Sequence, residues 1–209
     1  MTAPITPMAY QLTIEPDLNR FTFAGRMILA AEAGDPTGHL VLDCAELAIW
    51  SCHLQPGGGD EKRIDLPFTL DPPKTRLTIH LADALSGPFQ LTIDYAGKIN
   101  DRMAGFYRSR IKTGKRLDYI AVTQFQESDA RRAFPCLDHP AQKAVFTVEM
   151  VIDKHLTAIS NTDIQAITEL ADGRRRVTFH PTPKMSTYLL FFGVGPFEIH
   201  EDTDDRRVR

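Results

Sequence analysis

Residues 10–29 read YQLTIEPDLNRFTFAGRMIL, and they carry the pattern that decides the fold class. Apolar and polar residues alternate along 10–15, and the alternation returns at 21–24 and leads into 27–29. A side-chain period of two is the period of a β-strand, which turns alternate residues to opposite faces. The stretch therefore predicts two successive strands joined by a polar turn.

The same pattern recurs along the rest of the chain. Further candidate strands, rich in Ile, Val, Thr, Phe and Tyr, lie at 40–42, 47–54, 77–81, 89–95, 119–122, 145–152, 176–180 and 188–192. Turn residues separate them at 56–60, 71–73 and 172–173. No segment of ordinary helix length, about 12 residues, keeps a 3.6-residue period, and 128–133 is at most a turn or two. The sequence predicts an all-β fold of two packed or strongly twisted sheets.

Length and charge limit the domain count and the partners. The chain has 209 residues, 43% of them hydrophobic and 24% charged, which fits one globular β domain over 1–209 and excludes disorder as the dominant state. Twenty-four Lys and Arg against 27 Asp and Glu leave a net charge of −3. We therefore expect no nucleic-acid partner and no anionic membrane surface, because neither is favoured by the overall charge.

The N-terminus and the cysteines predict a cytoplasmic protein. Residues 1–7 lack a basic start followed by an apolar run, so no signal peptide is indicated. The longest apolar stretch, near 188–194, is far shorter than the roughly 20 residues of a membrane span. Cys44, Cys52 and Cys136 are odd in number and widely spaced, which argues against a disulfide framework, although Cys44 and Cys52 could pair. Three buried thiols are the expected arrangement.

Common catalytic and metal-binding motifs are missing from the sequence. None of the seven histidines lies in H-E-x-x-H, and no C-x-x-C pair is present. Because a local zinc site is written with such spacings, we expect no metal ligand in this chain. There is also no G-x-S-x-G, P-loop or G-x-G-x-x-G motif. The residues alone thus name no catalytic group.

The densest segment is 119–146, YIAVTQFQESDARRAFPCLDHPAQKAVF. A strand pattern leads into Gln124 and Gln126, which are two residues apart and would share one face of an extended backbone. Two amides side by side can accept hydrogen bonds from an ammonium group and donate them to a carbonyl. On pattern alone, ordinary solvent-facing polar residues explain them as well.

This segment resembles a signature of the zinc aminopeptidase family that includes aminopeptidase N and leukotriene hydrolase, T-Q-F-E-x-x-D-A-R-R-x-F-P-C-x-D-E-P-x-x-K-A-x-F. The chain has TQFQ at 123–126, DARRAFPC at 129–136, DHP at 138–140 and KAVF at 143–146. GFYRS at 105–109, SN at 160–161, TPKMSTYLL at 182–190 and the opening 10–25 also look like the family. The resemblance covers nearly the whole chain but only the family's N-terminal domain, which is an all-β, saddle-shaped sandwich.

The resemblance implies that the chemistry lies outside this chain. The family's zinc ligands and catalytic glutamate occur in H-E-x-x-H, and its exopeptidase motif is G-x-M-E-N. Both belong to a following thermolysin-like catalytic domain, and neither motif occurs here. We therefore expect the chain alone to be inactive and to bind no cofactor, with zinc in the absent catalytic domain. The implied partners are that catalytic domain of the same parent protein and a peptide N-terminus as substrate.

Two glutamines are the substrate-binding residues that the resemblance implies. Gln124 matches the residue that lines the pocket for the first side chain of the substrate, and Gln126 matches the Glu or Gln that helps to hold its free α-amine. An exopeptidase must count one residue from the N-terminus, and a fixed anchor for the ammonium group does this by positioning. The sequence does not give the preferred first residue or the oligomeric state.

One position departs from the family pattern. His139 stands where the family usually has Glu in D-E-P, and we expect the tripeptide to be structural, as turn chemistry favours. A metal role for His139 has no partner ligand in view. Asp129, Arg131 and Arg132 are expected to be internal ion-pair or cap residues of the same loop.

Two other functions remain open at this point. A standalone, non-catalytic binding or scaffold module derived from the family would keep the fold without the catalytic centre. A β-sandwich enzyme built around Cys136 and His139 would need a nucleophile and a base within hydrogen-bond reach. Residues 207–209 look like the first residues of another strand, which favours a domain cut from a longer chain.

Overall fold

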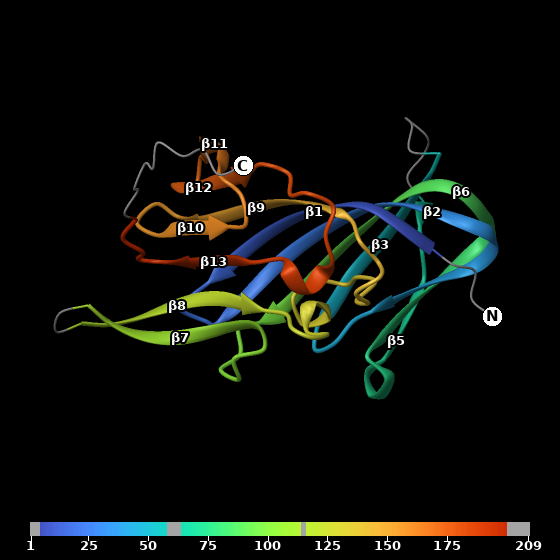
Figure 1. The fold of residues 1–209 in the computed structure, drawn as a ribbon. Coiled ribbons are helices and arrows are strands. Elements are labelled where there is room, and N and C mark those ends of the chain that lie inside the picture. The colour runs from blue at the N-terminus through green and yellow to red at the C-terminus, as the bar shows by residue number, and fades with distance from the viewer. Residues whose placement is uncertain (1–4, 58–63, 114–115, 200–209) are drawn as a thin grey trace.

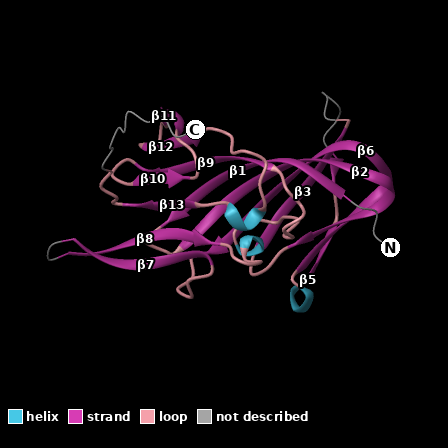
Figure 2. Ribbon diagram, in the orientation of Figure 1, coloured by secondary structure: helices cyan, strands magenta, loops and turns pink. Residues whose placement is uncertain are grey.

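The computed structural model describes residues 5–57, 64–113 and 116–199 (Figure 1). The turn expected at 56–60 lies partly outside these residues, and the strand expected at 207–209 lies wholly outside them. The strands are β1 Ile5–Asp17, β2 Thr22–Asp43, β3 Ala48–Pro56, β4 Ile64–Asp65, β5 Phe68–Asp71, β6 Arg76–Lys98, β7 Gly105–Thr113, β8 Arg116–Gln124, β9 Val145–Asp153, β10 Thr157–Ser160, β11 Ile164–Glu169, β12 Arg174–Phe179 and β13 Phe192–Gly195. The helical turns in the described residues are 3-10 turns, η1 Pro72–Lys74, η2 Ala130–Arg132 and η3 Thr187–Leu189 (Figure 2).

These strands form two sheets, which confirms the predicted all-β fold. The larger sheet has the order β11-β12-β9-β1-β2-β6-β3-β4, and β5 pairs with β6 at one side of this path. Its pairings are antiparallel except that of β1 with β9, which is parallel. The smaller sheet, β10-β13-β8-β7, is antiparallel. Figure 1 shows the larger sheet strongly curved, with the smaller sheet lying along one part of it.

Strand continuity differs from the sequence prediction in two places. The pieces expected at 21–29 and 40–42 are one strand of 22 residues, β2, and those at 77–81 and 89–95 are one strand of 23 residues, β6. The two strands pair along their length, with register shifts between Ala33 and His39. The prediction of a strand at 188–192 was wrong, because the chain makes the 3-10 turn η3 there and β13 begins only at Phe192.

The core lies between the two sheets and includes a continuous row of aromatic rings. Phe23 of β2 contacts Phe106 of β7 edge-on at 5.3 Å between ring centroids, and Phe106 contacts Phe192 of β13 at 5.2 Å. Phe125 follows β8 directly and continues the row, 5.9 Å from Phe192 and 6.0 Å from Phe134. Such edge-to-face pairs are favoured by the ring quadrupoles. The row therefore anchors the residue that separates the two candidate glutamines.

Candidate functional site

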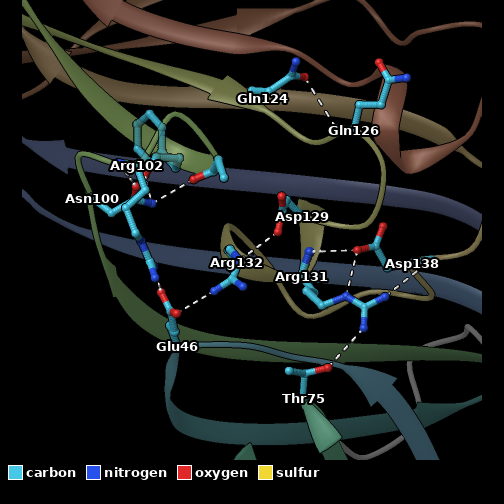
Figure 3. Close-up of polar contacts among 12 residues, drawn as sticks. Glu46, Thr75, Asn100, Arg102, Gln124, Gln126, Asp129, Arg131, Arg132 and Asp138 are labelled. Carbon is cyan, nitrogen blue, oxygen red and sulfur yellow. Dashed lines mark hydrogen bonds and ion pairs between the residues drawn. The ribbon is translucent and has the colours of Figure 1, made fainter.

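The two glutamines lie where β8 ends. Gln124 is the last residue of β8, and both Gln124 and Gln126 are exposed, while Phe125 between them is buried in the aromatic core. The alternation of exposed and buried residues continues past the strand end, so the two glutamines lie on the exposed side, as the spacing predicts. Figure 3 shows their side chains next to one another at the end of β8.

The side-chain amides of Gln124 and Gln126 differ in the hydrogen bonds that they make within the chain. The backbone N–H of Gln126 donates to Oε1 of Gln124 at 3.4 Å, which holds the Gln124 side chain along the loop (Figure 3). The Gln126 side chain has no hydrogen-bond partner within the described part of the chain. The peptide bond from Gln126 to Glu127 is cis. The amide of Gln126 is thus available to an outside group, with one acceptor oxygen and two N–H donors.

Arg131 ties the loop after the glutamines to the larger sheet. Its Nε donates to Oδ2 of Asp138 at 3.0 Å, and its Nη1 lies 3.2 Å from Oδ1 of Asp43 and donates to Oγ1 of Thr75 at 3.1 Å. The Asp138 side chain has no exposed surface, and its other oxygen accepts from Thr187 Oγ1 at 2.7 Å. A buried carboxylate is tolerated only with such partners. Both oxygens of this buried carboxylate are therefore hydrogen-bonded, and these bonds hold the loop in place.

Arg132 makes a second fastening, nearer the surface. Its Nε donates to Oδ1 of Asp129 at 2.7 Å, and its Nη1 donates to Oε1 of Glu46 at 2.5 Å. Arg102 donates to the other oxygen of Glu46, so one carboxylate joins two arginines from different loops (Figure 3). Burial alone would raise the pKa of Glu46, but the hydrogen bonds from Arg102 and Arg132 outweigh it and hold that pKa below its ordinary value.

The ion-pair role expected for Asp129, Arg131 and Arg132 is thus confirmed. The capping role is not, because Asp129 precedes η2 without a side-chain hydrogen bond to it. We refer to Asp43, Glu46, Thr75, Asp129, Arg131, Arg132 and Asp138 together as the loop clasp. Backbone hydrogen bonds support the clasp, since Asp43 and Cys136 exchange two, at 2.8 and 3.0 Å, and Ala45 N–H donates to the carbonyl of Arg131 at 2.9 Å.

A second loop, residues 99–104, connects β6 to β7 next to the end of β8. Asn100 holds it by donating from Nδ2 to the carbonyl of Ala104 at 2.8 Å and by accepting from the N–H of Arg102 at 2.8 Å. Met103 has a left-handed backbone, φ 56°, and is 72% exposed. Gly105, which follows, pairs with Gln124. A large exposed apolar side chain therefore lies two residues before the position that pairs with Gln124.

The structure assigns structural roles to the remaining residues of the segment. His139 is exposed, and its Nδ1 accepts from the N–H of Ala141 at 3.2 Å, while the carbonyl of Pro140 accepts from Ser186 Oγ at 2.6 Å. Cys136 is completely buried, and desolvation raises its pKa well above the ordinary value. The thiolate is the reactive form of cysteine, so burial and a raised pKa contradict the hypothesis that Cys136 is a nucleophile with His139 as its base.

The three cysteines are free and buried, which confirms the expectation of unpaired thiols. Among residues 5–57, 64–113 and 116–199, no three His, Cys, Asp or Glu side chains lie close enough to hold a metal ion. The donor set of this part of the chain therefore does not fit zinc. In the same residues no helix has the length and apolar character needed to cross a membrane.

Comparison with known proteins decides the family. Residues 6–189 match the model of the peptidase M1 N-terminal domain. The chain belongs to this family. Among its relatives, "Puromycin-sensitive aminopeptidase" of Caenorhabditis elegans is 38% identical over 195 residues, which cover 92% of this chain and 20% of that protein.

Two further relatives agree with this M1 assignment. "Aminopeptidase 2" of Candida albicans is 36% identical over 207 residues, covering 98% of this chain and 22% of that protein. "Aminopeptidase M1-A" of Oryza sativa is 36% identical over 209 residues, covering 97% of this chain and 24% of that protein. The M1 domain thus spans about a fifth of the length of the curated aminopeptidases that it matches.

Sequence reasoning missed part of the loop clasp. Asp43, Glu46 and Thr75 hold the arginines, yet they lie more than 50 residues away in the chain and follow no motif. Glu46 and Thr75 both have left-handed backbones, φ 59° and 51°, which is uncommon for residues other than glycine. No local pattern signals that geometry, so only the fold brings these residues to the M1 signature.

Proposed function

We propose that this M1 domain is the substrate-anchoring N-terminal domain of a zinc-dependent aminopeptidase. Gln124 and Gln126 contribute to a site for a peptide N-terminus, which the domain shares with a catalytic domain of the same polypeptide. The observation that carries the proposal is the Gln126 amide, exposed and without a hydrogen-bond partner in the described structure, on a loop that the clasp fastens. The names of the relatives support the reaction class.

The chemistry of the anchor follows from the amide group. Oε1 of Gln126 accepts a hydrogen bond from the α-ammonium group of the peptide, and Gln124 lies toward its first side chain. Hydrogen bonds to a charged group contribute about 1.5–3 kcal/mol, more than neutral pairs. Because Gln126 is itself neutral, acidic residues of the catalytic domain supply the remaining compensation for the ammonium charge. The anchor thus sets the distance from the peptide N-terminus to the scissile bond.

The clasp gives the anchor its fixed position. Arg131 holds the loop to the larger sheet through Asp43, Arg132 holds it to Glu46, and Phe125 holds it to the core. A preorganised group loses little conformational freedom when the substrate binds, which lowers the cost of positioning. Displacement of the loop by about 1 Å is enough to lose much of that benefit.

The catalytic metal belongs to the other domain in this proposal. Zinc polarises a peptide carbonyl and activates water when it is bound in such a domain. The described residues of this chain offer no ligand set for it, so their part is to bind and orient the peptide. The cytoplasm is the proposed location, because three free buried thiols are typical of proteins kept in a reducing compartment.

Kinetics of the longer polypeptide that contains this domain test the proposal. Gln126→Ala should raise KM for peptides with a free N-terminus, while Gln126→Glu should tighten binding of the amine unless neighbouring acids crowd it. Gln165→Ala, at an exposed position of β11, is the matched control and should leave KM unchanged. A standalone binding module would instead show no peptidase activity in any form, and equal KM values for wild type and Gln126→Ala would refute the anchor.

A further inference from the structure

The face of the larger sheet that points away from the smaller sheet carries a hollow of about 510 Å³. Alternation along β2 fixes its direction, because Phe23 and Met27 point into the core and Ala24 and Arg26 point outward. The hollow is lined by Thr13, Glu15, Ala24, Gly25, Arg26, Trp50, Ser51, Asp94 and Arg176. Its volume falls within the usual range of small-molecule sites, about 300–1,000 Å³.

Trp50 forms one side of this hollow and is unusual for an outer sheet face. It is the only tryptophan of the chain and is 61% exposed. The pairing of β3 with β6 shifts register between Ile49 and Ser51, so Trp50 is the extra residue of a β-bulge. Bulges re-aim a side chain, and they are frequent next to binding sites. Within the described residues, the indole stacks on no other ring and its N–H has no hydrogen-bond partner.

The polar groups around the indole form a row across the sheet. Register places Glu149, Thr13, Arg26, Asp94 and Ser51 side by side on β9, β1, β2, β6 and β3. Thr13 Oγ1 donates to Glu149 at 3.3 Å, and Ser51 Oγ donates to Asp94 at 3.0 Å. Neighbouring strands lie about 4.8 Å apart, so five of them present polar atoms over about 19 Å.

The charges of this row are already compensated. Arg26 makes two hydrogen bonds to Asp94, at 2.6 and 3.2 Å, and Glu149 lies 3.8 Å from Nε of Arg176. Glu15, which also lines the hollow, pairs with Arg174 at 2.9 Å. The hydrogen bond to Asp94 raises the pKa of Arg26, so the guanidinium stays charged and paired. A free ion would have to break one of these pairs in order to bind. The hollow therefore favours a neutral ligand over an anion or a cation.

We propose that this hollow binds a neutral oligosaccharide. A pyranose ring has an apolar face of C–H groups, which the exposed indole of Trp50 accepts, and a rim of hydroxyls. Glu15 and Arg176, which also line the hollow, can accept hydrogen bonds from such hydroxyls and donate to them. The small side chain of Ala24 keeps the floor low on the outer face, which leaves room for the ring. The site is independent of the two glutamines.

Tryptophan fluorescence of the full chain tests this directly, because Trp50 is the only tryptophan. The probes are cellotriose, maltotriose and triacetylchitotriose. At least one should give a saturable change in emission with a dissociation constant of about 1 mM or lower. No saturable change with any of the three, up to about 10 mM, overturns the proposal. Saturation by sodium acetate, guanidinium chloride or triglycine in place of the sugars also overturns it.

Variants locate the binding. Calorimetric titration replaces fluorescence here, because Trp50→Ala removes the signal. Trp50→Ala should weaken the binding of the sugar by about tenfold or more. Trp50→Phe keeps an aromatic face and should weaken binding less. Leu117→Ala removes another exposed apolar side chain, 62% exposed and outside the hollow, and should leave the affinity unchanged. Sugar binding that survives Trp50→Ala places the site elsewhere and overturns the assignment.

Discussion

Arg131 donates from Nε to Oδ2 of Asp138 at 3.0 Å, and the Asp138 side chain has no exposed surface. The same oxygen accepts from the backbone N–H of Arg131 at 3.3 Å, and the second oxygen accepts from Thr187. One buried carboxylate thus joins the loop that carries the glutamines to η3, the turn that precedes β13. The stability of the domain and the placement of its anchor depend on the same group.

Removal of Asp138 should destabilise the domain strongly. Asp138→Ala leaves Arg131 without its buried partner, and breaking one half of a buried pair costs about 3–5 kcal/mol. Urea unfolding followed by circular dichroism measures the change. Glu169→Ala is the matched control, since it breaks the exposed pair with Lys154 and should cost less than about 1 kcal/mol. Equal losses for the two variants would show that the clasp is not a stabilising centre.

Acid should weaken the contribution of Glu46 to the free energy of unfolding. Its pKa is lowered in the folded state, so its ionised form stabilises the fold above the unfolded pKa, and this contribution disappears as pH falls through the folded pKa. We expect the difference in free energy of unfolding between wild type and Glu46→Gln to be largest near pH 7. It should shrink below the ordinary glutamate range, about pH 4.3. Urea midpoints at several pH values measure it, and a difference that grows on acidification would contradict the assigned pairs.

Gly105 should tolerate no side chain. Its φ is +69°, and a Cβ there would lie 2.7 Å from Cβ of Arg132. Gly105→Ala combines backbone strain with displacement of the clasp, so we expect a loss of about 1–3 kcal/mol. Gly38→Ala is the control, because nothing lies within 4 Å of its added Cβ. Thermal unfolding of the two variants distinguishes them, and a neutral Gly105→Ala would mean that the loop can shift freely.

The fold class could be predicted from alternation, but several elements could not. Every residue of β11 is exposed, so this strand lacks the buried apolar face from which a strand is predicted. Residues Gly34, Asp35 and Pro36 resemble a turn, yet β2 continues through them at its register shift. At Tyr188 a short apolar run fits either a strand or a tight turn, and periodicity cannot separate these.

The candidate site was predictable only where it follows a contiguous signature. Gln124, Gln126 and the arginine pair are found in one stretch, and the expected ion pairs involve residues of that stretch. Glu46 and Thr75 reach the same arginines through tertiary contacts alone. The hollow at Trp50 was also invisible in the sequence, because a β-bulge and the cross-strand register create it.

The 209-residue chain should show no aminopeptidase activity alone. The described residues offer no metal site, so added zinc has no catalytic centre to complete. Hydrolysis of aminoacyl-p-nitroanilides, with and without added zinc, measures this, and the longer polypeptide that contains the domain is the positive control. Robust, zinc-dependent hydrolysis by the purified chain would contradict the division of roles between two domains.

The most direct test of the anchor is a thermodynamic cycle in that longer polypeptide. It combines a substitution of Gln126 with removal of the substrate amine. Values of kcat/KM are compared for wild type and Gln126→Ala, each with a peptide and with its analogue in which a hydroxyl replaces the α-amine. If Gln126 holds the ammonium group, the two changes should couple by about 1.5–3 kcal/mol, because each removes the same hydrogen bond. Additive effects, with coupling below about 0.5 kcal/mol, would contradict the proposed role of Gln126.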